Sequence, residues 1–351
     1  MEKKHLIIPI FVPHLGCPND CVFCNQKKIS GQMKQITKED VKKTVDYYLD
    51  IFGDQDAYKE IAFFGGSFTG IEEELQEELL QAAYEYIKNK KINSIRISTR
   101  PDYINKNILK RLKKYKVKTI ELGVQSSNDY ILKKAGRGHT FEDVKKASKL
   151  IRRHRFILGH QMMIGLPESS LNDELKTAKD LAKLKPKIMR IYPVLVIKDT
   201  ELENEYKEGK YRPLNVNQAV EICKDVYYYF IKKKINVIRI GLQTTDMICN
   251  PKNGGSAVVA GPYHEAFRQL VEDAMWYDSI LERIKKLNIK VREIEVIVNP
   301  VNANNVSGHK KENINKFKDT YDVDLKIKQD ANIAEGTFEI NVLKVYKDFL
   351  D

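Results

Sequence analysis

The sequence has few cysteines and no long apolar run. It holds 5 cysteines in 351 residues, and three of them, Cys17, Cys21 and Cys24, stand together near its start. So few thiols exclude a disulfide-stapled scaffold and suit a reducing cytoplasm. No apolar stretch approaches the length of a membrane span, so we expect no membrane partner. With 42% hydrophobic and 31% charged residues, the composition is that of a globular protein.

Negative charge is also in short supply. The chain has 48 acidic residues against 60 lysines and arginines, a formal net charge of +12. This excess favours a polyanionic partner such as nucleic acid. Lysine-rich stretches such as residues 106–118 and 145–155 also suit solvated outer helix faces that bind nothing. Charge alone therefore leaves both interpretations open.

The three clustered cysteines follow a short apolar run with the spacing Cys-x-x-x-Cys-x-x-Cys. Three thiolates this close can ligate three irons of a cubane [4Fe-4S] cluster, and the sequence has no fourth cysteine nearby. One iron is then left open. That iron can take the amine and carboxylate of S-adenosylmethionine, and one electron from the cluster can cleave the sulfonium to a 5′-deoxyadenosyl radical.

A zinc site made of His14 and the three cysteines is the alternative at this position. Structural zinc usually draws two separated pairs of ligands, and the sequence has no second pair. The remaining cysteines, Cys223 and Cys249, lie far apart and are expected to be ordinary thiols, so we expect no auxiliary cluster.

The cysteine spacing, with the aromatic Phe23 before the last cysteine, resembles the signature of the radical S-adenosylmethionine (radical SAM) superfamily. The resemblance implies an enzyme that binds a [4Fe-4S] cluster through Cys17, Cys21 and Cys24 and reductively cleaves S-adenosylmethionine. It also implies an electron donor such as flavodoxin or ferredoxin.

Short apolar strands alternate with amphipathic helices up to about residue 211. The expected strands are residues 6–12, 60–64, 94–99, 119–124, 157–164 and 188–196. The expected helices are residues 39–51, 72–88, 106–115, 130–135, 141–154 and a segment capped by Ser170 or Asn172 that runs to Lys183. This alternation predicts an α/β fold with a parallel sheet. Six units are too few to close an eight-stranded barrel, so we predict a partial (β/α)6 barrel.

Chemistry in such a barrel lies at the carboxyl ends of the strands, where the cysteine loop and several polar motifs fall. Gly65, Gly66 and Ser67 follow the second strand. A glycine pair lets the backbone approach a ligand closely, so its carbonyls and the serine could bind the ammonium group of the cofactor. A plain glycine turn is the alternative.

Two further pairs follow the third and fourth strands. Thr99 and Arg100 end the third strand, and Arg100 could pair with the cofactor carboxylate or a substrate phosphate. Gln125 and Ser126 end the fourth strand and could bind ribose hydroxyls. Capping of the barrel mouth is the alternative role for these residues. No residue is predicted as the catalytic group that acts on the substrate.

Four longer motifs, within residues 98–102, 120–126, 136–140 and 191–202, resemble the radical domain of the Elongator catalytic subunit. The cysteine spacing differs, because that family has a wider first interval. The Elongator subunit also carries a C-terminal acetyltransferase-like domain, for which we expect no room here. The resemblance therefore implies a relative that acts on RNA, with tRNA the first choice, by a transferase-like reaction of its own.

The chain is predicted to divide into a barrel (residues 1–211), an Elongator-like extension that packs on it (residues 212–278) and a small α+β tail (residues 279–351). The tail resembles a KH module, in which a Gly-x-x-Gly loop between two helices clamps a nucleic-acid backbone. The loop candidates are Gly308, His309, Lys310 and Lys311, with Lys311 where the second glycine would stand. Lys310 and Lys311 could still meet phosphates.

Three hypotheses remain open from the sequence. The first is a radical SAM enzyme that modifies RNA, either tRNA or rRNA, with the tail binding the nucleic acid and no DNA partner. The second is a radical SAM enzyme for a small metabolite, such as an anaerobic porphyrin or cofactor-pathway step. The third is a non-catalytic, metal-containing RNA-binding protein.

Overall fold

The computed structural model describes residues 4–12, 21–25, 36–245, 247–250 and 255–346. By its internal contacts the chain forms two compact units. Unit 1 takes residues 1–222 and 229–265, and unit 2 takes residues 223–228 and 266–351. Each unit is described below by itself.

Unit 1 is built on a seven-stranded sheet with the order β1-β2-β3-β4-β5-β6-β8, and every neighbouring pair is parallel. The strands are β1 (Lys4–Val12), β2 (Ala57–Gly65), β3 (Ser94–Thr99), β4 (Val117–Gln125), β5 (Ile157–Ile164), β6 (Ile188–Pro193) and β8 (Asn236–Ile240). The described strands do not close, since β1 and β8 are the two edges. The predicted partial barrel is confirmed, and β8 adds a seventh strand to the six expected.

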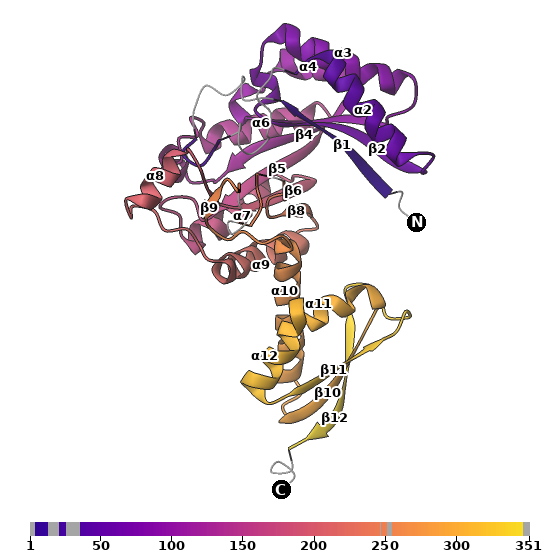
Figure 1. Cartoon of the computed structure of the whole chain (residues 1–351), viewed down its shortest axis with the longest axis vertical. Helices are drawn as coiled ribbons and strands as arrows, with labels where there is room; N and C mark the ends of the chain where they lie inside the picture. Colours follow the sequence, from indigo (N-terminus) through magenta and orange to yellow (C-terminus); the bar gives the residue numbers. More distant parts are fainter. Residues whose placement is uncertain (1–3, 13–20, 26–35, 246, 251–254, 347–351) are drawn as a thin grey trace. The chain divides into compact units, whose positions relative to one another are not determined.

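The helices of unit 1 connect the parallel strands. They are α2 (Lys38–Phe52), α3 (Glu73–Lys88), α4 (Lys106–Lys114), α5 (Asp129–Lys134), α6 (Phe141–Arg153), α7 (Leu171–Lys183), α8 (Glu201–Lys207) and α9 (Val216–Lys232), of which residues 223–228 belong to unit 2. Figure 1 shows α2, α3 and α4 beside the β1–β4 half of the sheet, and α7 and α9 beside β6 and β8. A two-stranded antiparallel sheet joins β7 (Val196–Ile197) to β9 (Val258–Ala260).

Helix starts in unit 1 are set by local sequence. Thr37, Thr140 and Ser170 each begin a capping box, in which the cap hydroxyl and an aspartate three residues later satisfy each other's backbone N–H groups. Of the two predicted caps of α7, Ser170 is the one found. No helix in the described ranges is both long and apolar enough to cross a membrane.

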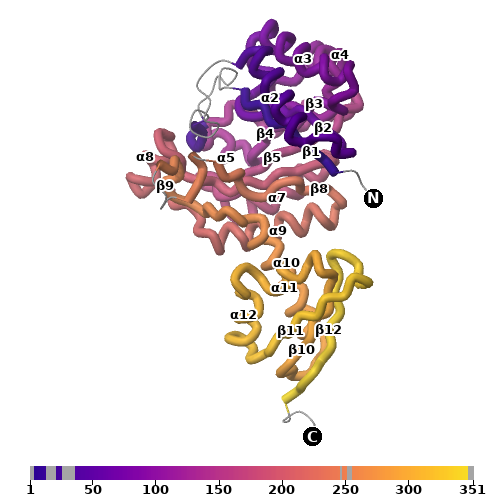
Figure 2. The backbone as a smooth tube through the Cα atoms, turned by 45° about the vertical axis from the view of Figure 1, so that its right-hand side comes forward, coloured from indigo at the N-terminus to yellow at the C-terminus, as the bar shows by residue number. Residues whose placement is uncertain are grey.

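Unit 2 holds a three-stranded sheet of order β11-β10-β12, in which β10 (Val291–Val298) is parallel to β11 (Asp324–Gln329) and antiparallel to β12 (Phe338–Val345). The three strands lie side by side in Figure 2. The helices are α10 (Phe267–Lys285), α11 (Ala303–Ser307) and α12 (Glu312–Tyr321). Phe317, Ile294 and Val296 are fully buried at the centre of its apolar core.

Helix α10 runs from Phe267 to Lys285 and so crosses the predicted end of the extension at residue 278. Its second half carries Ile280, a fully buried member of the core of unit 2. The predicted boundary between residues 278 and 279 therefore falls inside this helix. The three-domain division of the chain stays a prediction.

Candidate cluster and cofactor site

The described end of the cysteine loop, residues 21–25, is fixed by backbone hydrogen bonds. The Cys24 N–H donates to the Cys21 carbonyl at 2.9 Å and closes a tight turn between the two cysteines. Val22 donates to the Ala135 carbonyl at 3.2 Å and accepts from Leu202 at 2.8 Å. Segments that follow β4 and β7 thus hold this turn in place. Cys17 and His14 lie outside the described residues.

Arg137 joins the cysteine turn to the end of β4. Its Nη1 donates to the Cys21 Sγ at 3.3 Å, and its Nη2 donates to the Gly123 carbonyl at 2.7 Å. The side chain is buried, with 7% of the residue exposed. In the sequence, Arg137 stood out only as part of the family motif at residues 136–140. Its one local signal is that it stands between Gly136 and Gly138, both of which have positive φ.

Gln125 ends β4 in a left-handed backbone conformation, with φ of 72°. The residue is buried, and its Oε1 has no hydrogen-bond partner among the described residues. Its Nε2 and the Arg137 Nη2 lie 3.2 and 3.3 Å from where a Cβ on Gly123 would stand. A side chain at Gly123 would therefore crowd both groups. A buried amide oxygen without a donor is the feature expected of a ligand contact.

His139 covers the same strand end. One of its ring nitrogens, Nε2, lies 3.2 Å from the Val124 carbonyl and so must carry a proton to bond it. Burial, with the nearby charges of Arg137 and Arg100, lowers the pKa of His139 to about 4. The ring is therefore neutral near pH 7 and presents Nδ1 as an acceptor, which has no partner in the described part of the chain. The sequence did not single out this residue as a site.

Gly65 and Gly66 lie against the end of β1, from which the cysteine loop departs. Gly65 pairs with Val12 in the sheet register, and Gly66 N–H donates to the Val12 carbonyl at 3.0 Å. Gly65 has φ of 97°, and a Cβ there would lie 2.7 Å from the Val12 oxygen. Only glycine fits this close approach of two chains.

Ser67, Thr99 and Arg100 form one buried group at the ends of β2 and β3. The hydroxyls of Ser67 and Thr99 are 2.8 Å apart, and Arg100 N–H donates to Ser67 Oγ at 3.2 Å. The Arg100 guanidinium makes two hydrogen bonds to Asp102, at 3.0 and 2.9 Å. Its charge is thus already matched by a carboxylate of the chain.

The Ser126 hydroxyl is hydrogen-bonded within the protein, to helix α7 and to the backbone of Asn128. Its Oγ lies 3.3 Å from Thr177 Oγ1 of α7 and accepts from Asn128 N–H at 3.1 Å. Of the two residues predicted to bind ribose, Gln125 has an unused polar atom and Ser126 is engaged within the protein.

The loop candidates of unit 2 stand together between α11 and α12. Gly308 has φ of 75°, and Lys310 and Lys311 follow in left-handed conformations with both side chains exposed. His309 N–H donates to Asp273 Oδ2 of α10 at 2.8 Å. This backbone donor is therefore used internally.

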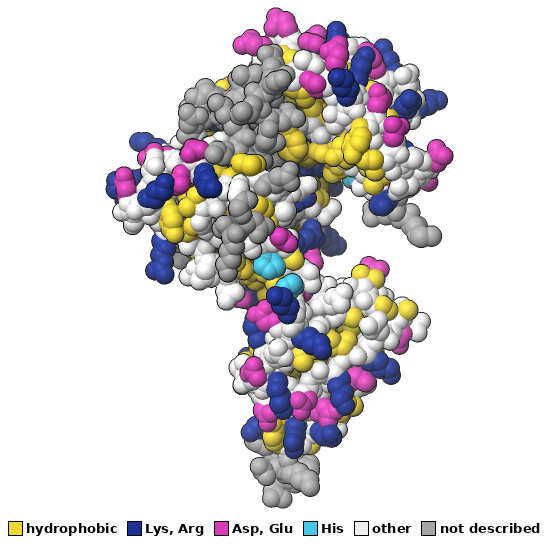
Figure 3. Space-filling model, in the orientation of Figure 1, with side chains coloured by type: hydrophobic (Ala, Val, Ile, Leu, Met, Phe, Trp, Pro, Cys, Tyr) yellow, Lys and Arg dark blue, Asp and Glu magenta, His cyan; other side chains and the backbone are white. Residues whose placement is uncertain are grey.

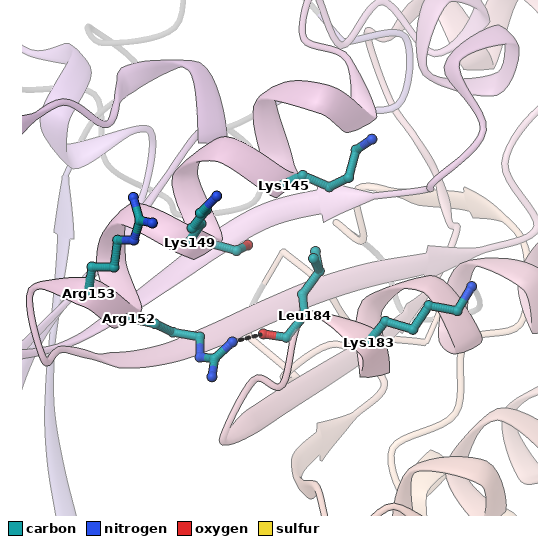
Figure 4. Close-up of a pocket in the computed structure, with 7 residues that line it drawn as sticks. Lys145, Lys149, Arg152, Arg153, Lys183 and Leu184 are labelled. Atoms are coloured by element: carbon teal, nitrogen blue, oxygen red, sulfur yellow. Dashed lines mark hydrogen bonds between the residues drawn. The ribbon is translucent and has the colours of Figure 1, made fainter.

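A basic groove that the sequence did not predict as a site lies between α6 and α7 (Figure 4). Its volume is about 510 Å³, and it is lined by Lys145, Ser148, Lys149, Arg152, Arg153, Lys183 and Leu184. Arg152 donates to the Leu184 carbonyl, and Lys183 pairs with Asp180. Lys149 and Arg153 have no such partner in the described part of the chain.

The fold is an unclosed parallel α/β barrel, and two free cysteines, Cys21 and Cys24, lie on the turn that Arg137 links to the end of β4. The sequence comparison identifies the class of protein with these features. Residues 11–181 match the Radical SAM superfamily, and residues 186–277 match the Radical SAM C-terminal domain. The chain belongs to the radical SAM superfamily. The cofactors of this class are a [4Fe-4S] cluster and S-adenosylmethionine.

Within the superfamily the relatives point to one branch. A tRNA uridine(34) acetyltransferase of Methanocaldococcus infernus is 30% identical over 183 residues, which cover 46% of this chain and 34% of that protein. An uncharacterized protein of Methanocaldococcus jannaschii is 31% identical over 225 residues, covering 62% of this chain and 64% of its own length. The chain thus spans from about a third to two thirds of these two relatives.

Elongator complex protein 3 of Homo sapiens is also a relative, 26% identical over 46% of this chain and 34% of its own length. Among solved structures, the archaeal Elp3 of Methanocaldococcus infernus with an N-terminal deletion has a TM-score of 0.62. It is 23% identical and covers 80% of this chain and 64% of that one. This likeness supports the fold.

The residues around Cys21 fit these cofactors. Cysteine sulfur is the usual protein ligand of an iron–sulfur cluster, and the Arg137 guanidinium places a positive charge beside the Cys21 sulfur. Three buried polar atoms near this strand edge, Gln125 Oε1, Arg137 Nε and His139 Nδ1, have no partner among the described residues. They offer two acceptors and one donor, as a polar, charged cofactor requires.

Proposed function

We propose that this chain is a radical SAM enzyme that modifies RNA, with tRNA as its substrate. The observation that carries the proposal is the site at the end of β4 in a parallel partial barrel. Arg137 bonds both Cys21 and Gly123 of β4, and the strand ends at Gln125, whose buried amide oxygen has no partner among the described residues. When bound, the cluster and S-adenosylmethionine supply a 5′-deoxyadenosyl radical that can abstract a hydrogen atom from the substrate.

In this proposal Cys17, Cys21 and Cys24 hold the cluster. The residues assigned to S-adenosylmethionine are Gly65, Gly66, Ser67, Thr99, Arg100, Gln125 and Ser126. Gln125 Oε1 accepts a hydrogen bond from the cofactor. The glycine pair, at the end of β2, lets the cofactor approach the backbone closely. Ser126 acts through its neighbours, because Thr177 already engages it. Arg100 bonds Asp102 through Nε and Nη2, so its Nη1 is the atom proposed to meet the cofactor carboxylate or a substrate phosphate. His139 Nδ1 is added as an acceptor.

RNA as the substrate class is supported by the tRNA-acting relatives and by the net charge of +12. Figure 3 shows basic and acidic side chains intermixed on the face it presents, so the charge excess is not gathered into one patch there. The groove between α6 and α7 and the exposed Lys310 and Lys311 are the proposed contacts with phosphates.

The KH-like assignment of the tail is also part of the proposal. Its support is the order strand β10, helix α11, a glycine-led loop, helix α12 and strand β11. A flavodoxin or ferredoxin is proposed as the electron donor. A cytoplasmic location stays a prediction.

The test of the activity uses anaerobically reconstituted full-length protein. We expect iron and sulfide in a four-to-four ratio, the absorption of a [4Fe-4S] cluster, and 5′-deoxyadenosine after reduction in the presence of S-adenosylmethionine. Replacement of Cys21 or Cys24 by alanine should abolish both cluster and product, whereas the control Cys249→Ala should keep them. Wild-type protein that binds a single zinc ion and forms no 5′-deoxyadenosine would contradict the proposal.

The test of the substrate compares nucleosides of tRNA and rRNA from wild-type and deletion strains by mass spectrometry. We expect one modified nucleoside of tRNA to disappear in the deletion strain and to return with the wild-type gene but not with the Cys21→Ala variant. An unchanged profile, with S-adenosylmethionine cleavage that RNA does not stimulate, would instead favour a small metabolite as the substrate.

A further inference from the structure

Arg137 differs from the other buried arginines of the described chain in its counter-ion. Arg96, Arg100 and Arg190 each pair with a carboxylate at 2.9 Å or less. Arg137 is equally buried, yet no carboxylate of the described residues forms an ion pair with it. Its hydrogen-bonded neighbours are the Gly123 carbonyl and the sulfur of Cys21. A buried cation is costly unless an anion matches it.

We propose that Arg137 is the counter-ion of the iron–sulfur cluster and raises its reduction potential. This inference rests on the proposed function, since it takes Cys21 as a cluster ligand. The nearest candidate for the missing anion is then the thiolate of Cys21, which carries negative charge when it ligates iron.

The direction of the effect follows from charge. One-electron reduction takes the cluster from [4Fe-4S]2+ to [4Fe-4S]1+, with the electron supplied by the external donor, and no bond to Arg137 forms or breaks. A fixed positive charge beside a ligand sulfur stabilises the more negative, reduced form. A hydrogen bond to that sulfur acts in the same direction, because it withdraws charge from the ligand.

The geometry explains why the side chain is an arginine. The guanidinium fork uses Nη2 on the Gly123 carbonyl of β4, which leaves Nη1 aimed at Cys21 Sγ. A lysine has a single nitrogen at its tip and no such planar fork. Gly123 gives the fork room, since a Cβ there would lie 3.3 Å from Nη2. The same grip ties the cluster ligand to the strand that ends in Gln125.

A purely structural clamp on β4 is the competing explanation. It predicts that replacing Arg137 lowers stability and leaves the potential unchanged. The counter-ion role predicts a change in potential in protein that remains folded and loaded with iron. The two explanations therefore differ in a measurement that does not depend on enzymatic turnover.

The experiment is an anaerobic redox titration, followed by electron paramagnetic resonance, of reconstituted wild-type, Arg137→Gln and Arg137→Lys proteins. Arg283→Gln, which removes an exposed arginine of α10, is the matched control. At the wild-type midpoint we expect about a tenfold lower reduced-to-oxidised ratio in Arg137→Gln, which is about 59 mV for one electron. Arg137→Lys keeps the charge and should show a smaller decrease, and Arg283→Gln should match the wild type.

Circular dichroism and iron content are measured on every sample. Loss of iron from folded Arg137→Gln, but not from Arg283→Gln, also supports the counter-ion role, and Arg137→Lys then supplies the titration. An unchanged midpoint in folded, iron-loaded Arg137 variants overturns the inference alone. A wild-type protein that assembles no [4Fe-4S] cluster overturns the proposed function, and this inference with it.

Discussion

The carboxylate of Glu174 accepts a hydrogen bond from the N–H of Gly165 at 2.8 Å. The same oxygen accepts from the Ser169 hydroxyl at 2.7 Å. On the other side of the peptide chain, the Tyr211 hydroxyl donates to the Gly165 carbonyl at 2.7 Å. The turn after β5 is therefore held from α7 and from the segment after α8. Burial raises the pKa of Glu174 to about 7.

This pKa predicts a specific pH dependence of stability. Between pH 4.5, the ordinary pKa of a glutamate, and about 7, the folded chain binds more protons at Glu174 than the unfolded chain does. The stabilising contribution is thus complete below pH 4.5 and is lost as the pH rises to about 7. Its size is on the order of 3 kcal/mol. Glu174→Gln should remove this part of the pH dependence.

Urea unfolding at several pH values between 4.5 and 8 measures this contribution of Glu174 to stability. The free energy of unfolding of Glu174→Gln relative to the wild type should increase across this range. Glu168→Gln, an exposed carboxylate on the same turn, serves as the control and should follow the wild type. Parallel curves for Glu174→Gln and the wild type would show that Glu174 titrates normally.

Glu121 of β4 bridges two arginines inside the barrel, accepting from Arg96 at 2.7 Å and from Arg190 at 2.6 Å. Burial tends to raise the pKa of Glu121, but the two guanidinium groups outweigh it and keep the pKa below its usual value. Glu121→Gln would leave the buried Arg190 without a carboxylate partner, whereas Arg96 keeps its pair with Glu60. We expect it to lower the free energy of unfolding by about 3 to 5 kcal/mol.

Chemical denaturation checks this expectation. Glu142→Gln breaks an exposed pair with Lys145 and should have no measurable effect. A Glu121→Gln protein as stable as the wild type would mean that neighbouring groups balance the positive charge of the arginines. Glu60, which already pairs with Arg96, would be the first residue to examine.

The groove between α6 and α7 predicts a second set of RNA contacts. Lys149 and Arg153 are one helical turn apart on α6, exposed, and without a partner in the described residues. Reversing both charges to glutamate should weaken tRNA binding by roughly tenfold near physiological salt. Lys106→Glu with Lys110→Glu repeats the spacing and the charge change on α4 and is the matched control.

Filter binding or fluorescence anisotropy with unmodified tRNA transcripts measures both pairs. An equal loss of affinity in the α6 and α4 variants would indicate that only net charge matters. No loss in either would leave the groove without a role in RNA binding.

For the loop between α11 and α12 in unit 2, we predict phosphate contacts from two side chains only. Because Asp273 already occupies the His309 N–H, phosphate contacts there depend on the side chains of Lys310 and Lys311. Changing both lysines to alanine should reduce the slope of log affinity against log salt by about 0.7 for each lost contact with single-stranded RNA. Lys328→Ala, an exposed lysine on β11, should leave the slope unchanged.

Salt titrations of RNA binding give the slope directly. If the wild-type slope survives in the double variant, the loop does not contact phosphates and the KH-like tail has another role. The activity of the barrel toward S-adenosylmethionine should be unaffected in either case.

The sequence by itself determined the features that depend on near neighbours in the chain. The spacing of Cys17, Cys21 and Cys24 predicted the cofactor class, and the 3.6-residue and strand periodicities predicted the alternating elements. Ser170 could be named as a helix cap because caps depend on local sequence. The relation to Elongator proteins also followed from contiguous motifs.

The tertiary structure decided which side chains meet. Arg137 reaches Cys21 across 116 residues, and no local pattern signals that contact. Ser126 bonds Thr177 of α7, 51 residues further along the chain, because a strand-end side chain can find its partner on a helix that packs against the strand. Strand β8 pairs with β6 and becomes the seventh strand of the sheet. The pairing gives hydrogen-bond partners to backbone N–H and C=O groups on the side of β6 that faces away from β5.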